Sequence, residues 1–160
     1  MDHIIFRPLQ QGDGPFLCSI FRGNQEYYAI FHDPEDRTWA WEERVSRFLQ
    51  QQVRHFILEA GQSSIGWLSC SDLSQTEREL DILVLKREYL GRGYGTAALS
   101  GFLQQCREDG VRSVVLNVSQ SNTRAIRFYD RFGFAVVAEQ IIPECNDATD
   151  LVMYQMRLEL

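Results

Sequence analysis

The sequence predicts a mixed α/β fold in a single domain that spans residues 1–160. Strand-like runs occur before, between and after segments whose apolar residues recur at helical spacing. A glycine-rich stretch, YLGRGYG, connects one of these strands directly to one of these helices. No internal repeat, low-complexity tract or Pro/Gly-rich linker interrupts the chain, and its length suffices to bury one full core.

The first half of the chain is predicted to hold one strand, two helices and a hairpin. Pro15 suits the first turn of the first helix. The second helix carries apolar residues at helical spacing, namely Trp41, Val45, Phe48 and Leu49. A turn-rich link, AGQSS, joins the two hairpin strands. The expected ranges are 3–9 for the first strand, 15 onward for the first helix, about 38–52 for the second helix, and 54–59 and 65–71 for the hairpin.

The second half is predicted to alternate strands with helices. A strand leads into the glycine-rich stretch and then into a helix, which ends before the cap residue Gly110. One face of that helix is apolar and carries Leu99, Phe102, Leu103 and Cys106. The expected ranges are 79–86 for the strand, up to 109 for the helix, 113–118 for a buried strand, 122–132 for the last helix, and 134–140 and 150–158 for the final strands. The resulting order is β-α-α-β-β-β-α-β-α-β-β.

Composition excludes several classes of protein. The chain is 44% hydrophobic and 24% charged, as in an ordinary soluble globular protein. No apolar run approaches the ~20 residues that span a bilayer, and the N-terminus lacks a secretion signal, so we expect a cytoplasmic location and no membrane partner. The net charge of −6 argues against nucleic acid as a partner.

Cysteine, histidine and lysine usage excludes further sites. The four cysteines, Cys18, Cys70, Cys106 and Cys145, have no CxxC spacing, so neither a disulfide framework nor a zinc site is indicated. The three histidines form no HxxxH pair, and no metal cofactor is expected. Lys86 is the only lysine, and the Gly-Lys-Ser/Thr triplet of the NTPase phosphate loop is absent.

The glycine-rich stretch predicts an anion site. Gly91, Gly93 and Gly95 stand between a predicted strand and a predicted helix. The first amides of that helix, near residues 94–97, lack intrahelical partners and form the positive end of the helix dipole. Without side chains at the glycines an anion could reach these amides, and Arg92 adds a full positive charge. A pyrophosphate is the natural ligand of such a site.

Two other interpretations of the glycines remain open. The first is a tight strand-to-helix turn without a ligand. The second is dinucleotide binding, because residues 93–98 fit a relaxed GxGxxA pattern. That pattern expects an acid about 20 residues on, at the end of the next strand, and residues 117–121 contain none.

Three segments together resemble the signature motifs of the GNAT superfamily of N-acetyltransferases: LKREYLGRGYG from residue 85, LNV from residue 116 and NTRAIRFYDRFGF from residue 122. The last segment has Asn, then Ala three residues on, Tyr seven on and Gly-Phe eleven and twelve on. The order of elements matches from end to end. The resemblance implies a mixed, mostly antiparallel sheet of about seven strands flanked by about four helices. One position departs, since Leu90 stands where the family usually has Gln or Arg.

The resemblance implies that acetyl-CoA is the cosubstrate. The strand before the glycines would bulge, take the pantetheine arm and offer a backbone N–H to the thioester carbonyl. The cofactor-binding positions lie in this strand, in the glycine turn and in the last helix: Leu83, Val84, Leu85, Gly91, Arg92, Gly93, Tyr94, Gly95, Thr96, Asn122 and Tyr129.

Tyr129 is the candidate acid, because it matches the family's tyrosine and a phenol can protonate a departing thiolate. It also shares an apolar helix face with Ala125, Phe128 and Phe132, so a core role is the competing interpretation. Asn122 could hold the pantetheine amides, cap its helix, or do both.

Glu79 and Asp81 are the candidate bases. Alternation along the strand ELDILV places both on one face, opposite Leu80 and Ile82. A half-buried carboxylate there would have a raised pKa and could take the proton of an ammonium group. Glu79 matches the position of a catalytic glutamate in several members of the family. A strand-end carboxylate in water is the structural alternative for each residue.

The acceptor is the least specified part of the prediction. Residues 27–43 combine five acids with several aromatic residues, which suits a cationic amine. A solvated loop with Trp39 and Trp41 in the core explains the same residues.

The sequence thus predicts an acetyl-CoA-dependent N-acetyltransferase that acts on a primary amine of a small molecule or peptide. Direct transfer in a ternary complex is expected, because no cysteine lies near the motifs in a nucleophile's context. A non-catalytic acyl-CoA-binding sensor or interaction domain with the same fold is the alternative. A homodimer is compatible with the sequence.

Overall fold

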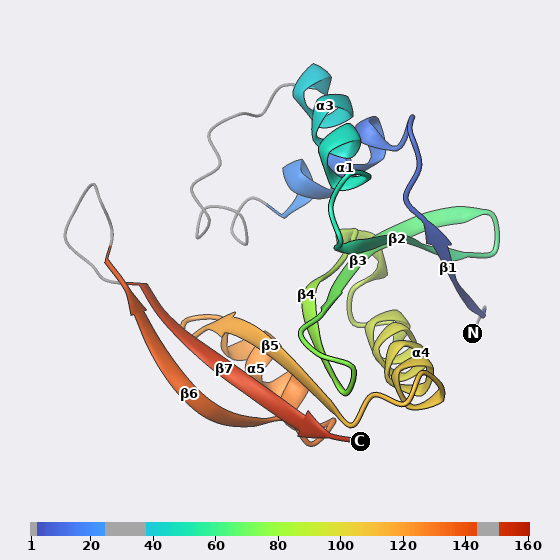
Figure 1. The fold of residues 1–160 in the computed structure, drawn as a ribbon. Helices are drawn as coiled ribbons and strands as arrows, with labels where there is room; N and C mark the ends of the chain where they lie inside the picture. Colours follow the sequence, from blue (N-terminus) through green and yellow to red (C-terminus); the bar gives the residue numbers. More distant parts are fainter. Residues whose placement is uncertain (1–2, 25–37, 144–150) are drawn as a thin grey trace. The chain divides into compact units, whose positions relative to one another are not determined.

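The computed structural model describes residues 3–24, 38–143 and 151–160 of the chain (Figure 1). Its helices and strands follow the predicted order, with one added 3₁₀ turn. The elements are β1 (Ile4–Pro8), α1 (Gly14–Gly23), α3 (Thr38–Phe48), β2 (Arg54–Ala60), β3 (Ser63–Asp72), β4 (Glu77–Leu85), η1 (Arg87–Tyr89), α4 (Tyr94–Glu108), β5 (Ser113–Ser119), α5 (Thr123–Asp130), β6 (Ala135–Ile142) and β7 (Leu151–Glu159).

The seven strands form one mixed sheet in the order β1-β2-β3-β4-β5-β7-β6. The pairs β1–β2, β2–β3, β5–β7 and β6–β7 are antiparallel, and β4–β5 is parallel. The parallel pair needs a crossover connection, which α4 supplies between β4 and β5. The expected mixed, mostly antiparallel sheet of about seven strands is therefore confirmed.

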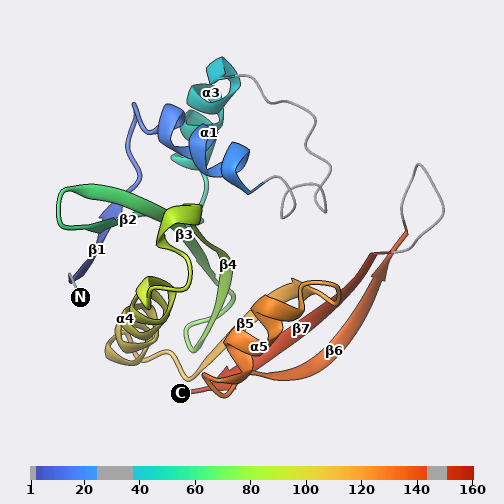
Figure 2. The same cartoon turned by 180° about the vertical axis from the view of Figure 1, so that it is seen from behind.

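The chain divides into two compact units. The first unit comprises residues 1–71 and 82–105, and the second comprises residues 72–81 and 106–160. In the first unit, α1 and α3 lie side by side (Figures 1 and 2). In the second unit, α5 covers one face of the strands β5, β7 and β6 (Figure 2).

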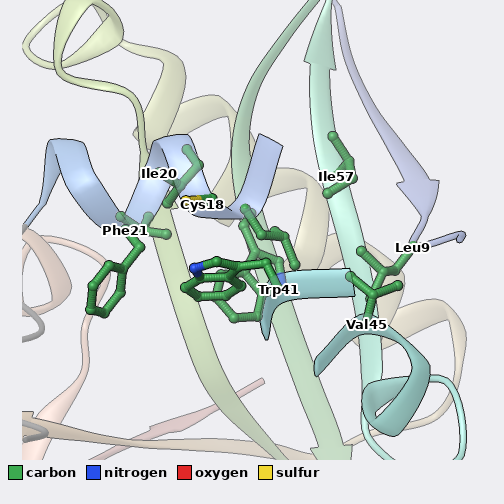
Figure 3. Packing of buried hydrophobic residues seen from close by; sticks show 10 residues of the cluster. Leu9, Cys18, Ile20, Phe21, Trp41, Val45 and Ile57 are labelled. Carbon is green, nitrogen blue, oxygen red and sulfur yellow. The ribbon is translucent and has the colours of Figure 1, made fainter. Parts of the chain in front are cut away.

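A cluster of buried apolar side chains forms the core of the first unit. Trp41 of α3 is only 2% exposed and lies at the centre of this cluster (Figure 3). Its ring centroid is 5.4 Å from that of Phe21 in α1. Val45 and Ile57 are fully buried in the same cluster. Trp41 and Val45 thus point inward, as the helical spacing predicts.

The predicted end of α3 is wrong by about one turn. The helix ends at Phe48, and Leu49, which was expected on its apolar face, is 49% exposed. The amides of Gln50 and Gln51 bond to carbonyls three residues back, which tightens the chain out of the α-helix. The residues directly after Leu49 are polar, so a longer helix would bury no further apolar side chains there.

The core of the second unit surrounds β5, where only Asn117 is exposed. Phe134, 1% exposed, and Met156 of β7, which pairs with Leu116 of β5, are buried as well. A buried cation lies at the start of β4, where Arg78 donates to Asp72 and to Asp109 at 2.7 and 2.8 Å. These two carboxylates offset the cost of burying the guanidinium.

The apolar face predicted for the helix after the glycines is confirmed. Its four members, Leu99, Phe102, Leu103 and Cys106, are all buried. Gly110 has a φ of 79° and donates its amide to the Arg107 carbonyl, as expected of a residue that ends α4.

Candidate active site

Glu79 and Asp81 occupy alternate positions of β4, with the buried Leu80 between them. Because strand side chains alternate, both carboxylates lie on one face of the strand, as predicted. Glu79 is half-buried and Asp81 is exposed. Glu79 is therefore the more enclosed of the two candidate carboxylates.

Glu79 has an electrostatic environment that suits a base. Burial raises the pKa of its carboxyl group, and the negative charge of Asp81 raises it further. A hydrogen bond from Asn117 Nδ2 to Glu79 Oε1, 2.8 Å long, acts in the opposite direction and lowers this pKa. Sequence reasoning did not assign Asn117. The sequence feature that could have identified Asn117 is a polar amide among the apolar residues in the centre of a strand.

The glycine turn lies between β4 and α4. Gly91 and Gly93 have φ values of 71° and 86°, which only glycine adopts without strain. The Gly93 carbonyl accepts the amide of Ala97 at 3.0 Å, so Gly93 caps the helix. Gly95 is already inside α4. The shape of the turn thus explains Gly91 and Gly93, but it gives no reason for Gly95.

The first turn of α4 presents unpaired backbone donors. An α-helix bonds each amide to the carbonyl four residues earlier, so the amides of Tyr94, Gly95 and Thr96 have no acceptor within the helix. Arg92 is exposed beside them, and its Nη1 donates to the Glu88 carbonyl at 3.2 Å. This arrangement can bind an anion through its backbone.

The strand segment before the turn is buried at its end, where Val84 and Leu85 are 8% and 6% exposed. Gly66 of β3 faces this segment closely, since a Cβ atom there would lie 2.5 Å from the Val84 carbonyl oxygen. The Lys86 amide donates to the Ile65 carbonyl at 2.8 Å. Gly66 thus allows β3 to approach the backbone that is expected to receive the pantetheine arm. The bulge expected in this segment stays a prediction.

Asn122 caps α5, as one of its two proposed roles requires. Its Oδ1 atom accepts the amide of Ala125 at 3.2 Å, and the helix begins at the next residue. Its second proposed role, toward pantetheine, stays a prediction.

Tyr129 is half-buried on the apolar side of α5. Its ring centroid lies 5.2 Å from that of Phe128 and 5.7 Å from that of Phe134. The aromatic packing expected from the helical spacing is therefore present. The role of the hydroxyl group in catalysis stays a prediction.

The candidate residues fall into the two units. Glu79, Asp81, Asn122 and Tyr129 belong to the second unit, where Glu79 and Asp81 share one face of β4. The candidate cofactor positions between residues 83 and 96 belong to the first unit.

Most of the candidate acceptor segment, residues 27–37, lies outside the described residues. Two of its five acids lie in α3, where their contacts are known. Glu42 accepts hydrogen bonds from the start of α1, and Glu43 pairs with Arg47 at 3.4 Å. Glu42 therefore has a structural partner, and Trp41 is a core residue, as the structural interpretation of this segment expected.

Two features of the described ranges bear on other functions. In the part of the chain that the structure describes, His, Cys, Asp and Glu side chains form no group of three or more that could hold a metal ion. Within the same ranges, every helix is too short or too polar to cross a lipid bilayer.

Known relatives share this sequence pattern. The model of the acetyltransferase (GNAT) family matches residues 17–134. The uncharacterized N-acetyltransferase YafP of Escherichia coli K12 is 30% identical over 156 residues, which cover 92% of this chain and 91% of that protein. A mycothiol acetyltransferase of Propionibacterium freudenreichii subsp. shermanii is 28% identical over 120 residues, 71% of this chain. The chain spans 38% or less of the length of the mycothiol acetyltransferases it matches.

Solved structures share the fold. An acetyltransferase from Thermus thermophilus superposes with a TM-score of 0.76 over the whole of both chains, at 21% identity. A spermidine N-acetyltransferase from Vibrio cholerae, solved with CoA and spermine, has a TM-score of 0.82 at 17% identity and covers 98% of this chain and 95% of its own. The family model matches most of this chain, and the sheet and helix order agree with these folds. The protein belongs to the acetyltransferase (GNAT) family.

Proposed function

We propose that this protein transfers the acetyl group of acetyl-CoA to a primary amine of a small molecule or peptide, by direct attack in a ternary complex. The observation that carries this proposal is the start of α4. It presents three amides without intrahelical acceptors and contains Gly95, a glycine that the turn conformation does not require. Since glycine weakens a helix by about 1 kcal/mol relative to alanine, its presence here favours close approach of a ligand.

The pyrophosphate of acetyl-CoA suits these donors. Its negative charge would meet the positive end of the helix dipole at Tyr94, Gly95 and Thr96, and the cation of Arg92. Leu90 carries no polar group, so backbone amides would supply the contact that a Gln or Arg supplies elsewhere in the family. A complex with CoA in a neighbour of the same fold supports this assignment.

The chemistry assigned to the side chains is one acyl transfer. The neutral amine nitrogen attacks the thioester carbonyl carbon, a C–N bond forms, and the C–S bond breaks. Glu79 accepts the ammonium proton before the attack, and Tyr129 gives its phenolic proton to the departing thiolate. The nitrogen loses its second proton as the amide forms, and this proton restores the phenol of Tyr129. The raised pKa of Glu79 supports its role as base. Asp81 raises that pKa and is the second candidate for the base.

The backbone of residues 83–85 is assigned to the thioester. One N–H of this segment would donate to the carbonyl oxygen and stabilise the negative charge that develops there. The close approach of Gly66 to Val84 supports a fixed position of this strand.

A cationic amine is the proposed acceptor. Glu79 and Asp81 place two carboxylates on one face of β4, which would attract a positively charged chain. Spermidine N-acetyltransferases of Vibrio cholerae share the fold, and a polyamine is therefore the first acceptor to test. We also propose that residues 1–160 act as one acetyltransferase domain, because the family model draws on both units.

The experiment is a screen of amines for thiol release from acetyl-CoA. Polyamines, aminoglycosides and peptides with free amino termini are each incubated with the protein, and the acetylated amine is identified by mass. The proposal expects one acetylated amine for each thiol released. Tight CoA binding in calorimetry without turnover of any amine would instead identify a non-catalytic acyl-CoA-binding domain.

A further inference from the structure

Asn117 makes a specific contact that its position alone does not require. The residue lies in the centre of β5, between the buried Leu116 and Val118, and its side chain is the exposed one of that strand. Its Nδ2 atom donates to Oε1 of Glu79 on the neighbouring strand at 2.8 Å. An amide at an exposed sheet position could equally bond to water, so the contact selects one orientation of the Glu79 carboxylate.

The strand register shows which charged groups share this face. Directly paired residues lie on the same face of a sheet. Glu79 pairs with Val115, and Val115 pairs with Arg157 of β7. Among the described residues of β4, β5 and β7, the titratable groups on the Glu79 face are therefore Glu77, Asp81, Arg157 and Glu159.

Arg157, the cation among these groups, forms hydrogen bonds with groups other than Glu79. Arg157 donates to the carboxylates of Glu77 and Glu159, and its Nη2 donates to Ser113 Oγ at 2.9 Å. These contacts hold the guanidinium at the Glu77 end of the strands. Glu79 instead accepts a hydrogen bond from the neutral amide of Asn117.

We propose that Asn117 is a positioning residue for the base: its amide fixes Oε1 of Glu79 and leaves Oε2 to take the proton of the acceptor amine. This inference rests on the proposed function, because it assigns Asn117 a role through Glu79. A charged donor such as Arg157 in that place would stabilise the carboxylate strongly and make it a poor base. A neutral amide orients the carboxylate at a smaller cost in basicity.

The contact also has a measurable electrostatic effect. Burial and Asp81 raise the pKa of Glu79, and the hydrogen bond from Asn117 opposes both. A general base must be deprotonated to act, so loss of the amide should raise the pKa of Glu79 and move the acidic limb of the activity profile to higher pH. Aspartate at this position adds a like charge and should move the limb further.

The experiment combines two readouts on Asn117→Ala and Asn117→Asp. The first is the titration of the Glu79 carboxyl carbon by NMR, which needs no acceptor. The second is kcat/KM of thiol release against pH. Gln140→Ala on β6 is the control, because it removes an exposed amide from the same sheet away from Glu79.

We expect the NMR titration of Glu79 to move to higher pH in Asn117→Ala, and further in Asn117→Asp. Relative to wild type, kcat/KM of Asn117→Ala should fall about threefold more at pH 6 than at pH 9, the scale of one hydrogen bond. The control should leave both readouts unchanged.

Two results would overturn the inference. An unchanged Glu79 titration in both variants would show that the contact does not act on the carboxylate, even if stability falls. A moved titration with an unmoved pH profile would show that Asn117 does not act on the base of the reaction. The absence of any thiol release from the wild type would contradict the proposed function instead. The NMR titration would still show whether the contact with Asn117 acts on the Glu79 carboxylate.

Discussion

The Glu42 carboxylate in α3 caps the first turn of α1, where its Oε1 atom accepts the amide of Gly14 at 2.7 Å. Its Oε2 atom accepts the amide of Gly12 at 3.2 Å. Asp13 stands at the N-cap position, but its carboxylate pairs with Arg7 at 2.8 Å instead. The acid that stabilises α1 is therefore supplied by another helix, about thirty residues further along the chain.

Glu42→Ala should lower the free energy of unfolding by about 1 kcal/mol, because amides at the start of α1 lose their acceptor. Glu43→Ala is the matched control. Glu43 is exposed and pairs with Arg47 one turn away, so its removal should cost less than about 0.5 kcal/mol. Urea unfolding of the two variants measures the difference. Equal losses would show that the cap contributes nothing beyond a surface carboxylate.

His55 should make the protein sensitive to acid. Its ring stacks on Phe48 at 4.5 Å, its Nδ1 accepts from Trp67 Nε1 at 3.3 Å, and burial lowers its pKa from 6.5 to about 4. The unfolded chain takes up this proton near pH 6.5, and the folded protein does so only near pH 4. Stability should therefore fall as the pH drops through that window, by about 2 kcal/mol after allowance for partial exposure.

His55→Gln removes the titrating group while keeping a hydrogen-bond acceptor for Trp67. Its unfolding free energy should vary less between pH 6.5 and pH 4 than that of the wild type, since the carboxylates titrate in both proteins. Denaturation at several pH values provides the comparison. Parallel curves for the two proteins would contradict the assignment of this sensitivity to His55.

Gly95→Ala separates ligand binding from turn geometry. Gly93→Val is a poorer test, because Gly93 has a φ of 86° and a branched side chain there would strain the backbone. Alanine at position 95 lies within α4 and should raise thermal stability, yet its methyl group would stand among the amides proposed for the pyrophosphate. We expect CoA affinity to fall roughly tenfold, the scale of a hydrogen bond to a charged group.

Ser100→Ala is the control for this helix, because it changes an exposed residue of α4 beyond the first turn. Calorimetry with CoA should give wild-type affinity for it. Wild-type affinity in Gly95→Ala as well would rule out close contact of the pyrophosphate at this amide.

Tyr129→Phe tests the proposed acid. The aromatic contacts with Phe128 and Phe134 remain, so stability should change by no more than about 1 kcal/mol. Turnover should fall by ~10²-fold, the scale of one acid–base group. Tyr154→Phe is the control, since it removes a hydroxyl of β7 that accepts from Gln120 in the turn after β5. Full turnover in Tyr129→Phe would make Tyr129 a packing residue and leave the thiolate to water.

Periodicity predicted the elements but not their distant contacts. The alternation of Glu79, Leu80 and Asp81 was enough to place two carboxylates on one face. The apolar spacing of α3 located Trp41 in the core, but it carried the helix one turn too far, to the exposed Leu49. The spacing of apolar residues along the chain does not show where a helix stops contacting the element against which it packs.

Tertiary contacts explain what the sequence could not reveal. Glu42 looked like part of an acidic acceptor segment, and its use as a cap depends on α1 lying beside α3. The contact of Asn117 with Glu79 depends on the parallel register of β4 and β5, which no local pattern specifies. Both contacts join residues more than twenty-five positions apart, where sequence spacing carries no information.

The central claim is that Glu79 removes the proton of an acceptor amine during acetyl transfer. Glu79→Gln keeps the shape of the side chain but cannot accept a proton, so the variant should use only amine that is already neutral. Asp81→Asn is the internal control, because it removes the same charge from the same face of β4.

The deciding measurement is the rate of thiol release against pH for the wild type and both variants, with an amine of high pKa at saturation. We expect Glu79→Gln to be slow at neutral pH and to recover partly as the pH rises, while Asp81→Asn stays closer to wild type. A silent Glu79→Gln with a slow Asp81→Asn would invert the assignment. If both variants matched the wild type at every pH, no carboxylate of β4 would be the base, and the central claim would be wrong.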